Sequence, residues 1–474
     1  MFIGNLSYRG IEFTFVFDGD ELRLIPPKDK YLEIKFEWYM IKTSENCYIP
    51  GKQLLMEEPF LSGLNTENNH YIIFITEQNS PVVNENGILY VEVSSYLIFK
   101  GEVKGINRLC FYSPEIDKIY DSHKAINIIF DDPLNQNGKF SINSEFPNQI
   151  TTKKQVFYVD DKKVQVHFGI NRKINFTSGE PPLVLNSYMY FDFDTTNDYY
   201  FILRLWHIAK DFISFLCYRQ DVFLPIVDIY TQCEWKQISY YKSGTLNILK
   251  ENGVTDIESL EKGRFIKYEY IAGNESKILS DIAIDELYSR HIPKSYYEKI
   301  HLNEARFIMI TAAVEWEFRK NYPDGIKKKC ETIEAEKNVS DTINKLIKES
   351  VGSEERKLYK RLNKFLDNIF KFPSLETKIN QVCKDYSDII DIFGQYLYNL
   401  NNKTLNYNKM SKRVSEQRNN FSHGNLDKEF ITDSLEDIIF LEYIVYAMQL
   451  KRFGISDENI KKAINELFHI NLHL

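Results

Sequence analysis

The sequence predicts an α+β chain in which a β-rich N-terminal domain, sandwich- or barrel-like, precedes an all-α helical bundle. Short segments of alternating apolar and polar residues, separated by Gly, Pro and Asn, occupy the first part of the chain. Apolar residues at helical spacing occupy the last part, from about residue 298. The 33 Phe and 31 Tyr among 474 residues also favour a substantial β-rich part, because aromatic residues fit a pleated sheet.

The clearest strand pattern runs over 11–17, where Ile, Phe and Val alternate with polar residues. A turn at Asp18-Gly19-Asp20 separates it from a second strand, 21–25, which ends at Pro26-Pro27. We expect further strands at 31–40, 71–76, 87–99, 125–130, 155–159, 163–168 and 188–193. Many short strands with turn residues between them are typical of a sandwich or a barrel.

Residues 198–220 change to a helical period with a broad apolar stripe. Strand-like stretches follow at 222–230 and 265–271. Pro293 makes a continuous helix through 285–297 unfavourable. The predicted organisation is therefore a β-rich domain over 1–197, a mixed connecting segment over 198–290 that packs with it, and a helical domain over 291–474.

The helical domain is predicted to begin with a helix at 298–321, which Tyr322-Pro323-Asp324-Gly325 ends. Ser456 is suited to cap the last helix. The other helices are expected at 326–350, 354–370, 375–399, 408–423, 434–453 and 457–468. The segment 434–453 is strongly apolar, so it is a candidate for part of an interface between two copies of the chain.

Charge and cysteine usage narrow the class of protein. The net charge of −8 disfavours a general nucleic-acid coat, so any RNA contact must come from a local basic patch. The six cysteines are scattered without zinc spacing, which indicates reduced thiols in a cytosol. No signal peptide and no uncharged membrane-length segment is found. We therefore expect a cytoplasmic protein without metal, cofactor or membrane contact.

In the β-rich part, two patterns have a functional and a plain interpretation. Asp192 and Asp194 flank Phe193, and such alternation fits two residues on the solvent face of a strand better than a metal site. His167 lies alone among strand residues and is expected to be an ordinary surface or core-edge histidine.

The stretch Arg418-Asn419-Asn420-Phe421-Ser422-His423-Gly424 carries the chemistry of a metal-independent ribonuclease. Histidine can exchange protons with the ribose 2′-OH and the leaving 5′-oxygen, since its unperturbed pKa is near 6.5. Arginine can hold the phosphate and stabilise its transition-state charge. We assign His423 as the acid/base group, Arg418 as the phosphate ligand, and Asn419 as the residue that orients one of them.

The spacing of the motif predicts how these groups lie. Asn419 and His423 are four residues apart and share a helix face, and Gly424 is a plausible helix stop. One chain supplies one histidine and one arginine, so a composite site between two symmetric copies would complete the chemistry. The rival interpretation is a surface helix end where Arg418 and His423 only meet solvent.

The motif RNNFSHG within a C-terminal helical domain resembles the HEPN superfamily of nucleotide- and RNA-acting helical domains. The opening MFIGNLSYRGIEFTFVFDG, followed by many short strands, is similar in outline to ApeA-type anti-phage proteins. The resemblance implies a HEPN-type homodimer, metal-free cleavage to 2′,3′-cyclic phosphate and 5′-OH ends, and a role in abortive infection. It also indicates that Glu315 holds Arg418 or a neighbour; a solvated glutamate is the alternative.

The approach to the motif is basic, and we assign Lys412 and Arg413 to substrate binding. Further basic clusters lie at 357–371 and 327–329. If the clusters surround one cleft, they would hold an RNA backbone. Lysine-rich helix faces that only keep a bundle soluble are the alternative, which is favoured for 327–329.

The leading hypothesis is a HEPN-type RNA endonuclease, with tRNA as one candidate substrate, whose N-terminal domain senses a phage-derived trigger or blocks the cleft. A second hypothesis is a non-catalytic RNA- or protein-binding or dimerisation module. Nucleotidyl transfer ranks last, because the chain has no Gly-Ser loop followed by spaced carboxylates.

Overall fold

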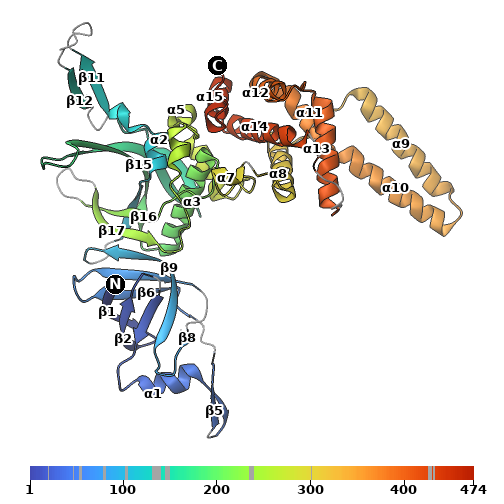
Figure 1. Cartoon of the computed structure of the whole chain (residues 1–474). Helices are drawn as coiled ribbons and strands as arrows, with labels where there is room; N and C mark the ends of the chain where they lie inside the picture. The colour runs from blue at the N-terminus through green and yellow to red at the C-terminus, as the bar shows by residue number, and fades with distance from the viewer. Residues whose placement is uncertain are drawn as a thin grey trace. The chain divides into compact units, whose positions relative to one another are not determined.

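The computed structural model describes the chain except residues 20, 46, 53–55, 78–81, 102–104, 131–139, 145–149, 234–239, 300, 425–429, 431–432 and 474. It divides into two compact units (Figure 1). Unit 1 comprises 1–214, 221–260 and 275–284, and unit 2 comprises 215–220, 261–274 and 285–474. The predicted α+β organisation is confirmed, since a β-rich N-terminal region is followed by an all-helical C-terminal region.

Six strands of unit 1 close into an antiparallel barrel. Each strand pairs with the next in the order β1-β2-β3-β9-β7-β6, and β6 pairs back with β1. The barrel-like alternative of the sequence prediction is therefore the one found. The strands are β1 Phe2–Tyr8, β2 Ile11–Phe17, β3 Glu21–Ile25, β6 Phe60–Asn65, β7 Tyr71–Thr76 and β9 Leu89–Phe99.

The barrel interior is filled by side chains that alternate along its strands. On β2, Phe13, Phe15 and Phe17 are all buried, as the alternating pattern of this segment predicts. Gly4 and Gly63 stand against the ring of Phe15, and a Cβ added to either would lie 2.6 Å from that ring. Glycine at these two positions therefore makes room for the largest side chain of the layer.

A second sheet of unit 1 continues from the long strand β9. Its strand order is β13-β14-β15-β10-β16-β17-β9, with antiparallel neighbours. The strands are β10 Ile106–Phe111, β13 Gln155–Val159, β14 Lys162–Ile174, β15 Leu183–Thr196, β16 Ile226–Gln232 and β17 Tyr240–Ile248. Of the strands in the barrel and the second sheet, β1, β6, β10 and β17 are not among those predicted from the sequence. In β17, Lys242-Ser243-Gly244 interrupts the apolar alternation.

The smaller elements of unit 1 connect these strands. Helix α3, Tyr199–Cys217, follows β15 as predicted, and its last residues belong to unit 2. The others are α2 Pro114–Ile119, η2 Ser122–Ala125, α4 Ile257–Glu261, α6 Glu275–Ala283, β4 Met40–Ser44, β5 Cys47–Pro50, β8 Val82–Val83, β11 Ile126–Phe130 and β12 Phe140–Ser144.

Two predicted strands are wrong. The segment 31–40 is helical, as α1 Tyr31–Ile34 and the π-helical turn η1 Lys35–Tyr39. Ile34 and Trp38, four residues apart, are buried, while the intervening Phe36 is exposed. Burial in this segment therefore follows the period of a helix and not that of a strand. The segment 265–271 contains the short helix α5, Tyr268–Ile271. Its aromatic residues have high strand propensity, but tertiary packing overrides that weak preference.

The helices of unit 2 follow the predicted order. The long predicted helix 375–399 is two helices, because the chain bends at Tyr386, whose hydroxyl donates to Asn321 Oδ1 at 3.0 Å. The bounds are α7 Tyr296–Lys299, α8 Glu304–Asn321, α9 Cys330–Glu349, α10 Ser353–Lys371, α11 Leu375–Asp385, α12 Ser387–Leu400, α13 Tyr407–Ser422, α14 Ser434–Arg452 and α15 Asp457–Leu467.

Helix α14 forms the centre of unit 2. It contacts α8, α12, α13 and α15, and most of its residues are buried. Its acidic side chains are paired, Glu442 with Arg306 and Asp437 with Arg413, as buried charges require. The expectation that this apolar segment forms part of an interface between copies is contradicted, because unit 2 itself covers it.

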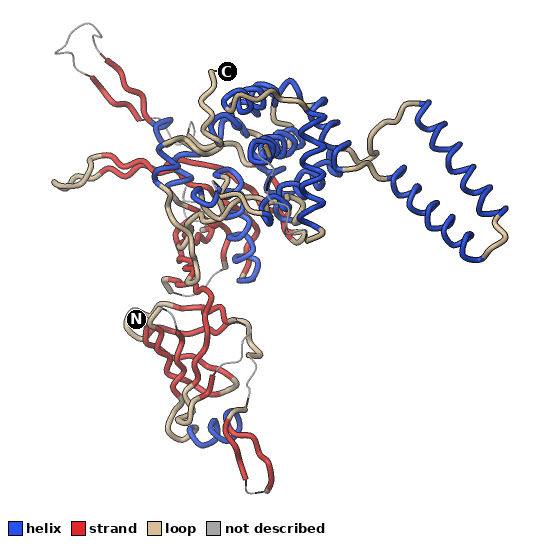
Figure 2. Tube along the Cα trace, turned by 45° about the vertical axis from the view of Figure 1, so that its right-hand side comes forward, coloured by secondary structure: helices blue, strands red, loops and turns tan. Residues whose placement is uncertain are grey.

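Helices α9 and α10 form a hairpin that stands away from the other helices of unit 2 (Figure 2). Neither helix has a buried residue. Within the described part of the chain, no helix combines the length and the apolar character needed to cross a membrane.

Candidate active site

Helix α13 carries the predicted motif and is held by one apolar face. Asn406 caps its start, since its Oδ1 accepts the backbone N–H of Lys409 at 3.0 Å. Met410, Val414 and Gln417 are buried at spacings of four and three residues. That face packs against α8, α11 and α14, which leaves the motif residues Arg418, Asn419 and His423 on the less buried side.

The helix ends at the motif, as predicted. His423 is the C-cap residue, and its backbone N–H donates to the carbonyl oxygen of Asn419 at 3.0 Å. Gly424 follows with φ of +68°, the left-handed conformation that glycine adopts without strain. The imidazole of His423 is exposed and makes no hydrogen bond with any residue that the structure describes. It is therefore accessible to a substrate.

Phe421 anchors the last turn of α13, between Asn419 and His423 in the sequence. Its ring packs edge-on against Phe307 of α8 at 5.5 Å and against Phe430 at 4.9 Å, measured between ring centroids. Phe307 is fully buried. The aromatic contact orients the last turn of α13, and with it the side chains on either side of Phe421.

Glu315 of α8 holds Arg418. The Nη2 of Arg418 donates to Glu315 Oε2 at 3.2 Å, which is one of the two alternatives that the sequence left open for Glu315. The Arg418 side chain remains 36% exposed. Its Nη1 also donates to Asn419 Oδ1 at 3.3 Å, so the predicted pair of polar neighbours is in contact.

Lys378 of α11 is a site residue that the sequence analysis missed. Its Nζ donates to Glu315 Oε1 at 2.8 Å, so two cations share one carboxylate. The side chain is only 15% exposed. Helix α11 carries a second lysine, Lys384, and several other polar residues, so the sequence does not single out Lys378 or show which carboxylate it meets. The group Glu315, Lys378 and Arg418 has a net positive charge, which favours an anion nearby.

The two residues assigned to substrate binding differ in their surroundings. Lys412 is 65% exposed and lies 3.9 Å from Glu416, a contact that leaves its Nζ open to solvent. Arg413 instead donates to both carboxylate oxygens of the buried Asp437, at 2.9 and 2.7 Å. The hydrogen bonds that Arg413 donates to Asp437 raise the pKa of Arg413. Arg413 thus holds α13 on α14, and its guanidinium is already occupied.

The other basic clusters do not surround the motif helix. Residues 357–371 belong to α10 of the hairpin, and Lys357 and Lys360 line a small cavity at the turn between α9 and α10. Lys328 pairs with Glu336 of α9. These residues provide a second basic surface rather than one cleft with α13.

Together, the motif presents an arginine held by a carboxylate, an amide next to it and an exposed histidine at the helix end. Such groups can bind an anion and transfer protons. Within the described residues, no group of three His, Cys, Asp or Glu side chains is placed to hold a metal ion.

No protein-family model matches the chain, and comparison with curated proteins and with solved structures finds no match either.

Proposed function

We propose that the chain is a metal-independent RNA endonuclease of the HEPN type that acts in anti-phage defence. The observation that carries the proposal is the Arg418–Glu315 contact beside an exposed His423 at the end of one helix. An arginine whose fork is oriented by a carboxylate can receive a phosphate with little loss of side-chain entropy. The proposal places the chain in the cytoplasm, where its six free cysteines would stay reduced.

In the proposed reaction, the ribose 2′-oxygen attacks the adjacent phosphorus and the bond from phosphorus to the 5′-oxygen breaks. One histidine takes the 2′-OH proton, and a second histidine gives a proton to the leaving 5′-oxygen. Arg418 stabilises the charge on the non-bridging oxygens. The products are a 2′,3′-cyclic phosphate and a 5′-OH end. Because each chain contributes one His423, the two histidines come from two copies.

The surface that we propose for the second copy is an apolar stripe on α10, formed by Leu358, Leu362, Phe365 and Ile369. They recur every three or four residues, share one helix face and are 62%, 41%, 61% and 50% exposed. Phe365 and Ile369 also line a cavity of about 950 Å³ at the base of the hairpin. A contiguous exposed stripe of this kind marks an interaction surface.

Charge favours another copy of the hairpin as the occupant of the α10 stripe. Helix α10 has six Lys and Arg against three Asp and Glu, whereas α9 has three Lys against five acidic residues. Two hairpins related by a two-fold axis can place the acidic α9 of one beside the basic α10 of the other. The result is a four-helix bundle with a core that neither hairpin has alone.

The test of catalysis is cleavage of total RNA by the purified full-length chain in EDTA, followed by end-group analysis. We expect cyclic phosphate ends with the wild type and loss of cleavage in His423→Ala and in Arg418→Ala. The controls His473→Ala and Arg319→Ala remove an exposed histidine and an exposed arginine of unit 2 that lie outside the motif, and both should cut RNA normally. Cleavage that survives in both motif variants contradicts the assignment.

The alternative is a non-catalytic binding or dimerisation module, which the exposed α10 stripe favours. A restrained nuclease is silent without its trigger, so the assay is repeated with lysate from phage-infected cells as a source of the trigger. A folded dimer that cuts no RNA under either condition would support the module and overturn the nuclease.

A further inference from the structure

One face of the second sheet of unit 1 gathers polar and aromatic side chains. Strand register places Arg108 opposite Asp192, and Tyr190 opposite both Cys110 and His167. Directly paired residues point to the same side of a sheet. We call this side the polar sheet face, formed by Arg108, Cys110, His167, Asn171, Tyr188, Tyr190, Asp192 and Asp228. Neighbouring residues such as Leu109, Phe168 and Phe191 point the other way and are buried in the core.

A cavity of about 410 Å³ opens on the polar sheet face. Hydrogen-bond donors from two strands and a loop line it, namely Arg108, Thr151, His167, Asn171 and Arg172. Among the described lining residues there is no aspartate or glutamate, and the nearby carboxylate of Asp192 is held by Arg108. A concave site with a guanidinium group, an amide and a hydroxyl matches the acceptor oxygens of an anion. We call it the cationic cavity.

The arginine at the floor of the cationic cavity is held in one orientation. Arg108 donates to both oxygens of Asp192, at 2.5 and 3.0 Å, and lies 3.7 Å over the ring of Tyr240. Lys154 also binds Asp192 at 2.6 Å. Two cations therefore share one carboxylate, so the positive charge on Arg108 is not fully offset and its side chain is preorganised.

His167 gives the second indication that the cavity is a ligand site. Its side chain is buried and stacks on Tyr190, with ring centroids 4.9 Å apart. Its Nδ1 has no hydrogen-bond partner among the described residues, and Asp192 Oδ2 lies 3.8 Å away. Buried polar groups are normally bonded, so this ring is completed by something that enters the cavity.

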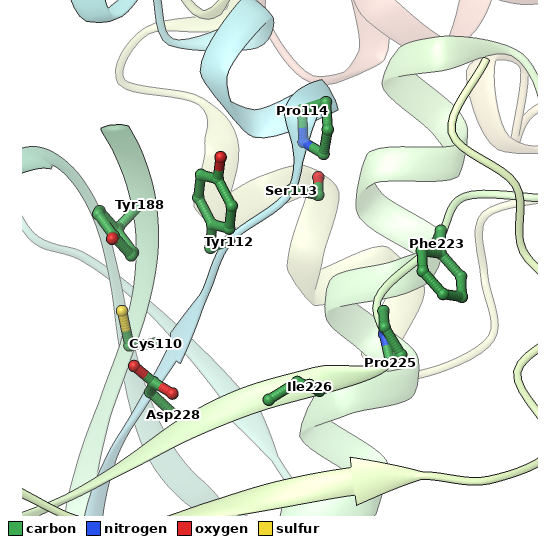
Figure 3. A pocket seen from close by; sticks show the side chains of 9 residues that line it. All are labelled: Cys110, Tyr112, Ser113, Pro114, Tyr188, Phe223, Pro225, Ile226 and Asp228. Atoms are coloured by element: carbon green, nitrogen blue, oxygen red, sulfur yellow. The ribbon is translucent and has the colours of Figure 1, made fainter. Parts of the chain in front are cut away.

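Figure 3 shows an aromatic pocket of about 370 Å³ that includes Cys110, Tyr188 and Asp228 of the polar sheet face. Tyr188 and Tyr112 stand on one side of it and Phe223 on the other, and the centroids of the two tyrosine rings are 5.5 Å apart. Tyr188 belongs to this pocket and Tyr190 to the cationic cavity, and their ring centroids are 6.1 Å apart. This tyrosine pair therefore stands between the two spaces.

We propose that the polar sheet face binds a nucleoside phosphate, with the phosphate in the cationic cavity and the base in the aromatic pocket. Guanidinium groups suit phosphate oxygens, and tyrosine rings suit the flat faces of a base. Asp228 at the floor of the aromatic pocket, already paired with Lys242, can accept a hydrogen bond from an exocyclic amine of the base. This inference does not rest on RNA cleavage by unit 2.

The test is calorimetric titration of the full-length chain with ADP, GDP, CDP and UDP, and with inorganic pyrophosphate. We expect saturable binding of at least one nucleotide, weakened at least tenfold by Asn171→Ala and by His167→Phe, which keeps the ring stacked on Tyr190. Tyr188→Ala should weaken nucleotide binding and leave pyrophosphate binding unchanged. The control Lys173→Ala removes an exposed cation beside Arg172 that does not line the cavity, and it should bind as the wild type does.

The absence of saturable binding by all four nucleotides overturns the proposal, as does binding that neither Asn171→Ala nor His167→Phe affects. Equal affinity for pyrophosphate and nucleotides, insensitive to Tyr188→Ala, overturns the nucleoside part and leaves an anion site. The measurement is nucleotide binding and not RNA cleavage. A failure of this proposal can therefore be told apart from a failure of the proposed nuclease.

Discussion

At the scale of single residues, the candidate active site depends on a carboxylate whose two oxygens are both bonded to cations of the chain. Glu315 accepts hydrogen bonds from Lys378 and Arg418, while Arg418 remains partly open to solvent. We therefore regard Glu315 as a positioning residue that fixes where the guanidinium points. Lys378 in turn limits the freedom of Glu315.

Glu315→Gln should lower RNA cleavage about 10- to 100-fold, because a misplaced phosphate ligand costs rate of that order. Glu315→Asp, which keeps the charge, should recover part of the loss, mainly in kcat. The measurement is steady-state cleavage of a defined RNA together with the melting temperature. Glu304→Gln on the exposed start of α8 is the control. Equal loss in Glu315→Gln and Glu315→Asp, with a lowered melting temperature, would indicate a structural role only.

His291 should make stability depend on pH. Burial, and next the nearby Arg306, lower its pKa to about 3. Below pH 6.5 the unfolded chain binds a proton that the folded chain does not, so stability falls as the pH falls from 6.5 toward 3. The loss is up to about 1.4 kcal/mol for each pH unit. Denaturant unfolding between pH 7 and 5 should show a smaller pH slope in His291→Phe than in the wild type. His473→Phe, at an exposed position, should keep the wild-type slope; an unchanged slope in His291→Phe contradicts the prediction.

At the scale of elements, the hairpin of α9 and α10 differs from every other helix pair of unit 2. Its two helices contact each other but have no buried residue. An αα-hairpin has one apolar seam, and here a second apolar stripe on α10 stays exposed. Elements with an uncovered apolar face are stabilised when another layer packs on them.

The double substitution Leu362→Lys and Phe365→Lys should weaken dimerisation on the order of 100-fold or more, since each buried side chain contributes about 1.5–3 kcal/mol. Sedimentation equilibrium over a range of concentrations measures this. Asp367→Lys, on the opposite side of α10, adds positive charge without touching the stripe and should leave the dimer intact. A dimer that persists in the double variant would exclude the α10 stripe as the interface.

At the scale of the whole molecule, the two units are not consecutive pieces of chain. Residues 215–220 and 261–274 precede the helical domain in the sequence but belong to unit 2. Phe215 stacks on Tyr446 of α14 at 5.0 Å, and Lys267 binds Glu466 of α15 at 2.9 Å. A cut at residue 291 therefore removes part of the core of unit 2.

Phe215→Ala in the full-length chain should destabilise unit 2 by about 3–5 kcal/mol, because the ring is fully buried and leaves a cavity. For the same reason, a fragment of residues 291–474 should lack a cooperative thermal transition. Circular dichroism during heating measures both. Phe223→Ala, at a partly exposed position of unit 1, is the control for the full-length chain. A fragment that melts as sharply as the intact chain would contradict this division.

The change from a β-rich part to a helical part, and several of the elements in each, were accessible from the sequence by itself. The strands 11–17 and 21–25 and the helices around Arg418 follow from local periodicity, and Gly424 ends α13 because only a residue tolerant of positive φ continues there without strain. Local spacing was insufficient at 31–40, where two buried residues four apart outweighed an alternating pattern.

Only the tertiary structure decided which side chains meet. Lys378 reaches Glu315 across 63 positions, and Arg108 reaches Asp192 across 84, because helix packing and strand register bring them together. Arg413 looked like a substrate ligand until its contact with Asp437 was known. His167 looked ordinary until its cavity was known. Periodicity encodes which face of an element is buried, but the partner across that face depends on packing between segments that are distant in the sequence.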